Sequence, residues 1–76
     1  MIFELWDLES GNIVGTYQTE EQALDVVRES VAAYGREYGK SMALGIEEKG
    51  YSKMLAEGEQ LVERAAKEPQ GGGNLP

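Results

Sequence analysis

A change of pattern between residues 12 and 24 constrains the fold of this chain more than any other feature. Ile13 to Tyr17 is rich in strand-forming residues, and Thr19 then stands at a favourable helix N-cap with Gln22 three residues later. A threonine and a glutamine at this spacing form a capping box, which satisfies backbone amides that the first helical turn leaves free. A strand that passes so quickly into a capped helix predicts a small α+β domain.

The first 17 residues predict a β-hairpin. Residues 2–8 are rich in strand formers, and residues 9–12 contain Gly11 and Asn12, which tolerate the positive φ angles of a turn. Two strands joined this closely must be antiparallel neighbours. Gly15, inside the return strand, predicts a bulge or a close backbone approach.

The middle of the chain predicts a helix over residues 20–34. Apolar residues recur at spacings of three and four from Leu24 to Tyr34, and Gly35 follows as a natural stop. Residues 36–39 are expected to be a connector.

The second half predicts two more strands and a second helix. Met42, Leu44 and Ile46 alternate with other residues, which is typical of a strand, and Gly50 favours a tight hairpin loop. We expect a fourth strand over 51–55 and a helix over 57–67. The alternative is one continuous helix capped by Ser52, which would change the order ββαββα into ββαβα.

The predicted fold is therefore α+β in the order ββαββα, with a four-stranded antiparallel sheet and two helices on one face. Residues 1–68 form the expected single domain. Residues 69–76 contain three glycines and two prolines with almost nothing apolar, so we predict a disordered tail.

The small size of the chain favours self-association. Seventy-six residues bury only a small core, and there is no cysteine to add a disulfide. Oligomerisation is the usual remaining source of stability. We therefore expect a homodimer, formed through the open sheet face or through a sheet edge.

The formal net charge of −7 restricts the classes of partner. Such a chain repels nucleic acids and anionic lipid surfaces but attracts basic proteins. No apolar stretch approaches the ~20 residues of a membrane span. Residues 1–4 lack the basic and long apolar regions of a signal peptide, so a cytoplasmic location is expected.

The residue types give no indication of catalysis, a metal or a cofactor. The chain contains no histidine, the commonest general base at neutral pH and the commonest metal ligand. The segment from Gly35 to Ser41 approaches a phosphate-binding loop, but only three residues separate its glycines, and it follows a predicted helix rather than a strand. We therefore expect a protein that is not an enzyme and holds no cofactor.

Two resemblances extend this interpretation. Glu4-Leu5-Trp6-Asp7, Glu9-Ser10-Gly11-Asn12 and Ala43-Leu44-Gly45 resemble segments of short uncharacterised bacterial proteins of unknown function, over most of residues 3–66. The joint Thr19-Glu20-Glu21-Gln22-Ala23-Leu24 is similar to the passage from hairpin to helix in HicB-type antitoxins. Together with the net charge of −7, the second resemblance gives an alternative function, an acidic, antitoxin-like inhibitor or regulator that binds a basic protein.

Three aromatic or aliphatic residues are the predicted interface. If Phe3 and Leu5 face the helices, alternation places Ile2 and Trp6 on the open side of the sheet. Exposed apolar patches mark interaction sites, and Trp and Tyr are enriched at their centres. We predict Ile2, Trp6 and Tyr17 as anchors of a small, non-enzymatic interaction module.

Overall fold

Within residues 1–67, four antiparallel strands form one open sheet in the order β2-β1-β3-β4. The strands are β1 Ile2–Asp7, β2 Asn12–Tyr17, β3 Met42–Glu48 and β4 Tyr51–Glu57. These elements belong to a computed structural model, which describes residues 1–67. The disordered tail that the sequence predicts over 69–76 lies outside the described residues.

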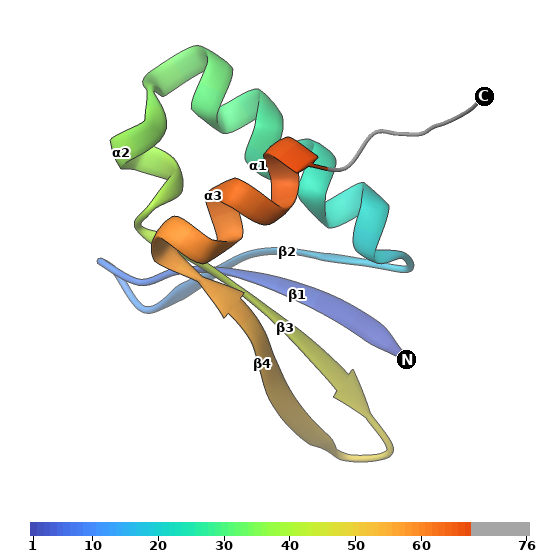
Figure 1. Cartoon of the computed structure of the whole chain (residues 1–76). Coiled ribbons are helices and arrows are strands. Elements are labelled where there is room, and N and C mark those ends of the chain that lie inside the picture. Colours follow the sequence, from blue (N-terminus) through green and yellow to red (C-terminus); the bar gives the residue numbers. More distant parts are fainter. Residues whose placement is uncertain (68–76) are drawn as a thin grey trace, which may run out of the picture.

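The described part of the chain contains three helices, and all of them lie on one face of this sheet (Figure 1). They are α1 Glu20–Tyr34, α2 Arg36–Gly39 and α3 Gly58–Lys67. The predicted α+β class and the order ββαββα are confirmed, with the single-turn helix α2 as an addition. The other face of the sheet carries no helix in residues 1–67.

The joint between β2 and α1 forms as its sequence indicates. Thr19 Oγ1 accepts a hydrogen bond from the backbone amide of Gln22 at 3.1 Å. The side chain of Gln22 reaches back to the backbone amide of Gln18, at 3.0 Å, rather than to that of Thr19. At the far end, Gly35 has a φ of +100° and donates its amide to Val31. At each end of α1, a nearby residue therefore forms a hydrogen bond with a backbone group that the helix itself leaves free.

The connector predicted over 36–39 is instead helix α2. Its last residue, Gly39, is buried against α1 and α3, where a Cβ atom would lie 2.6 Å from a methyl carbon of Val31 and 2.9 Å from one of Val62. Only glycine fits this approach without displacing either neighbour. The sequence offered no local sign of α2, because the packing partners come from distant segments.

The fourth strand is confirmed, and the continuous helix of the alternative ββαβα is wrong. Lys49 and Gly50 both have positive φ angles, as a two-residue hairpin loop of type I′ requires. Strand β4 continues to Glu57, two residues beyond the predicted end. Gly58 then takes a φ of +62° where the strand passes into α3. Glycine makes this abrupt change of direction inexpensive.

The core lies between the helices and the covered face of the sheet. Leu5 of β1 and Leu44 of β3 are completely buried, and so are Val27 of α1 and Leu61 of α3. Burial of each such side chain stabilises the fold by roughly 1.5–3 kcal/mol. Among residues 1–67 no polar or charged residue is buried, so the core is purely apolar.

Candidate interaction surface

We call the side of the sheet away from the helices the uncovered face. Among residues 1–67, four exposed apolar side chains lie on it. Trp6 of β1 is 36% exposed and lies opposite Ala43 of β3 and Ile13 of β2. Met54 of β4 lies opposite Gly45 of β3. The four exposed residues are Ile2, Trp6, Ile13 and Met54. The pairing register of the strands places these four residues on one side of the sheet.

A shallow hollow of about 180 Å³ occupies the uncovered face. It lies between Trp6 on β1 and Met54 on β4, over the strand β3 that separates them. At this point β3 carries Ala43 and Gly45, so almost no side chain fills the space. The lining also includes Glu4, Leu44, Ser52 and Lys53. The exposed surface of the hollow is mostly apolar.

Three carboxylates share the uncovered face with these apolar residues. Glu4 lies opposite Gly45, Glu47 opposite Ile2, and Glu57 opposite Ala43. Glu4 Oε1 also accepts a long hydrogen bond of 3.4 Å from the indole nitrogen of Trp6. The face is therefore apolar and acidic together.

The structure places two of the three predicted anchors on this face. Ile2 and Trp6 are both exposed there, as alternation predicts. Tyr17 lies elsewhere, because it pairs with Phe3, packs against the core, and holds its ring over Gly15 on the covered side. The hydroxyl oxygen of Tyr17 would be only 2.6 Å from a Cβ at Gly15, so the predicted close approach is present.

Sequence reasoning missed Ile13 and Met54. The register of β2 on β1 shifts between Leu5 and Trp6, whose partners are Gly15 and Ile13. This bulge leaves one extra residue, Val14, and sends Ile13 to the opposite side from Gly15. Simple alternation would place them on the same side. The side on which Met54 lies depends on the register of β4 on β3, which shifts between Leu44 and Gly45, so the predicted fourth strand alone did not reveal it.

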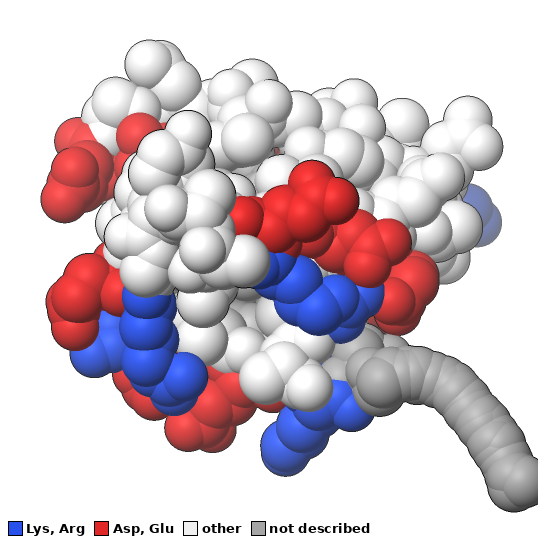
Figure 2. Space-filling model, turned by 90° about the horizontal axis from the view of Figure 1, so that it is seen from above, with Lys and Arg blue, Asp and Glu red and all other residues white. Residues whose placement is uncertain are grey.

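The helical side of the molecule has a different electrostatic character. Acidic and basic side chains lie next to one another there (Figure 2). Within residues 1–67, every ion pair lies on this side. The basic members are Arg28, Arg36, Lys40 and Arg64.

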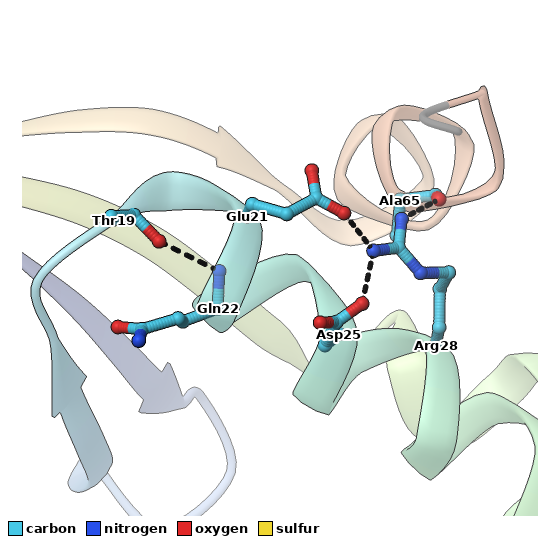
Figure 3. Close-up of polar contacts among 6 residues, drawn as sticks. All are labelled: Thr19, Glu21, Gln22, Asp25, Arg28 and Ala65. Atoms are coloured by element: carbon cyan, nitrogen blue, oxygen red, sulfur yellow. Dashed lines mark hydrogen bonds and ion pairs between the residues drawn. The ribbon is translucent and has the colours of Figure 1, made fainter. Parts of the chain in front are cut away.

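Arg28 connects the two long helices (Figure 3). Its guanidinium donates to Glu21 and Asp25 of α1 and to the Ala65 carbonyl of α3, the last at 2.6 Å. Partial burial lowers the pKa of Arg28, but the hydrogen bonds to Asp25 and Glu21 outweigh this effect and raise it overall. The bond to Ala65 satisfies a carbonyl in the last turn of α3, where a helix has unpaired acceptors.

A second cluster joins α2 to α3. Arg36 contacts Glu59 and Glu63, while Lys40 contacts Glu37 and Glu59. The hydrogen bond from Arg36 is the main reason that the pKa of Glu59 is lowered. These side chains are well exposed, so the cluster orients α2 rather than supplying much stability.

The described part of the chain contains neither a metal-binding cluster nor a membrane-spanning helix. Residues 1–67 contain no group of three or more His, Cys, Asp or Glu side chains placed to hold a metal ion. None of the three helices has the length and apolar character needed to cross a bilayer.

Comparisons with protein-family models, curated proteins and solved structures find no match to this chain. The resemblances to short bacterial proteins and to HicB-type antitoxins therefore stay predictions.

Proposed function

We propose that this chain is a non-enzymatic protein-interaction module that forms homodimers. We further propose that it contacts other proteins through the uncovered face of its sheet. One observation carries the proposal: exposed apolar side chains, including the only tryptophan, share a face with a shallow hollow, and no described helix covers that face. An exposed apolar patch of this kind marks an interaction site.

The dimensions of the molecule support the same proposal. The molecule measures 38 × 29 × 17 Å, so it consists of two thin layers with little interior between them. The core between these layers is small and has no disulfide. Association would add buried apolar area that one copy alone lacks.

The mass of the full chain in solution tests the homodimer. Sedimentation equilibrium is expected to give twice the 8.3 kDa of one chain at high concentration, with dissociation on dilution. A particle that stays at one-chain mass up to about 1 mM contradicts the homodimer.

The role of the face is tested separately by comparing two baits in a native lysate. Trp6→Ala removes the anchor, and Leu8→Ala is the matched control because Leu8 is exposed but lies in the turn after β1. Proteins held by the natural chain and by Leu8→Ala, but lost with Trp6→Ala, are the expected result. Identical captured sets on all three baits would reject the face as the contact surface.

A second candidate function is an acidic, antitoxin-like regulator of a basic protein. The observation that favours it is the set of carboxylates on the same face, at Glu4, Glu47 and Glu57. Charge complementarity of this kind accelerates association and makes it sensitive to salt.

A titration with a lysine- and arginine-rich peptide tests this second candidate. Emission from Trp6 reports binding, because Trp6 is the only tryptophan. The affinity is expected to fall several-fold from about 50 to 500 mM salt, and also with Glu4→Gln. Binding that is indifferent to both changes contradicts the candidate.

A further inference from the structure

We propose that two copies of this chain join edge to edge along β2, so that their two sheets become one sheet of eight strands and both uncovered faces stay accessible. The inference rests on the proposed homodimer and specifies where the copies meet.

The exposed edge of β2 has the character of a pairing edge. Strand β2 is hydrogen-bonded to β1 on one side and ends the sheet on the other. Its six residues, Asn12 to Tyr17, include no charged residue and no proline, and Ile13 and Val14 are exposed. Proteins that keep an edge strand unpaired usually protect it with lysine or another charged residue, or with proline.

The opposite edge has such protection. Strand β4 carries Lys53 and Glu57, and it continues directly into α3. Both edge strands contain a register shift, at Val14 in β2 and at Leu55 in β4. The two edges therefore differ in charge. Because β2 has no charged residue, it is the edge that can pair with the β2 strand of a second copy.

Repulsion between like charges disfavours a face-to-face dimer. Stacked sheets lie about 10 Å apart with interdigitated side chains. In such a dimer the carboxylates of Glu4, Glu47 and Glu57 would enter the same desolvated layer as their counterparts. Burial of charges without partners is strongly unfavourable.

The edge-to-edge arrangement separates these charges. Glu4 belongs to β1, one strand inside the edge, so three strand spacings of about 4.8 Å separate the two β1 strands. The resulting distance of about 14 Å exceeds the Debye length of about 8 Å at physiological salt. At the start of α1, Glu20 and Glu21 are already bonded to Arg64 and Arg28.

Charge exchange at one position provides the experiment. In an antiparallel pair of β2 strands, the midpoint of the strand falls between Val14 and Gly15, so position 14 of each copy lies near the two-fold axis. Val14→Lys and Val14→Glu are each expected to weaken the dimer at least ~10-fold by sedimentation. An equimolar mixture of the two variants is expected to restore the two-chain mass.

Two controls accompany this exchange. Tyr51→Lys and Tyr51→Glu place the same charges on β4 outside the hollow, because Tyr51 is exposed and does not line it, and they should leave the dimer unchanged. Emission from Trp6 should not shift to the blue as the natural chain dimerises, because the face stays in water. The recovery of mass on mixing also shows that both Val14 variants fold.

The outcomes separate the two proposals. Dimers that tolerate both Val14 variants, or a mixture that fails to recover, overturn the edge contact. A blue shift of Trp6 emission on dimerisation, with Trp6→Ala monomeric, overturns it as well and leaves a face-to-face homodimer. A natural chain that never dimerises rejects the homodimer itself.

Discussion

The helical layer and the sheet of this protein differ in how far their acidic residues are balanced by basic ones. Residues 19–40 and 58–67 contain seven acidic and five basic residues, and four of these basic residues make ion pairs. Residues 1–18 and 41–57 contain six acidic residues against two basic ones, and no ion pair among the described residues involves them. The unbalanced negative charge therefore gathers on the sheet and its loops.

The two sides of the sheet also differ in the burial of their apolar residues, as the single strand β3 shows. In β3, Leu44 points into the core and is completely buried, while its neighbour Gly45 leaves a hollow on the uncovered face. Apolar side chains on one side meet helices, and those on the other side meet solvent. A region with paired charges and a filled interior supports the fold, whereas one with unpaired charges and exposed apolar groups is suited to binding.

The largest expected effect is a difference in stability between substitutions on the two sides of the sheet. Leu44→Ala should lower the free energy of unfolding by about 3 kcal/mol, because it leaves a cavity beneath the helices. Met54→Ala, on the uncovered face, should cost less than about 0.5 kcal/mol. Urea unfolding of both variants measures the difference. Equal losses would mean that Met54 is packed in the monomer.

Glycine replacements sharpen the comparison further. Gly39→Ala should destabilise the protein by roughly 1–3 kcal/mol, because its Cβ would collide with Val31 and Val62. Alanine usually stabilises a helix relative to glycine, so the sign itself is diagnostic. Gly45→Ala meets only the Lys53 carbonyl, at 3.3 Å, and should cost less. Thermal unfolding distinguishes them, and a stabilised Gly39→Ala would contradict the close packing of α2.

Loss of the N-cap is expected to have an intermediate effect. Thr19→Ala removes the acceptor for the Gln22 amide and should cost about 1 kcal/mol. Ser30→Ala, within α1, is the control and should be neutral or slightly stabilising. Chemical unfolding followed by circular dichroism checks both. A neutral Thr19→Ala would show that packing alone holds the start of α1.

The smallest expected effect concerns pH. Hydrogen bonding to Arg36 lowers the pKa of Glu59 below its ordinary 4.5. A lowered pKa in the folded state contributes stability above the unfolded value, and this contribution is lost as pH falls through the folded value. Between pH 5 and about pH 3, the free energy of unfolding of Glu59→Gln should therefore fall slightly less than that of the natural chain.

Glu57→Gln is the matched control for this pH experiment, because Glu57 lies on the uncovered face and has no ion pair within residues 1–67. Its unfolding profile should follow that of the natural chain over the same acid range. A Glu59→Gln profile with unchanged acid sensitivity would show that solvent screens the cluster completely.

Local patterns allowed most of the fold to be predicted. The span of α1 from Glu20 to Tyr34 follows from its cap, its apolar spacing and Gly35, all of which act within a few residues. The β3–β4 hairpin likewise follows from alternation and from the positive φ that Gly50 adopts easily. Ile2 and Trp6 were placed on the uncovered face by alternation within one short strand.

The remaining features of the candidate surface required contacts between distant segments. The bulge at Val14 moved Ile13 to the side of Trp6, and pairing with Phe3 kept Tyr17 on the covered side. The hollow exists because β3 runs between β1 and β4, which brings Trp6 and Met54 to opposite sides of Gly45. Neither register nor strand order is readable from spacing alone.

By itself, then, the amino-acid sequence determined which segments become strands and helices, together with the acidity and the absence of cysteine and histidine. Propensity, capping and periodicity act over neighbouring residues, so they are written directly in the order of the chain. Only the tertiary structure decided which apolar residues share the uncovered face, which charges are paired, and why Gly39 must be glycine. Those outcomes depend on packing and register between segments that are far apart along the chain.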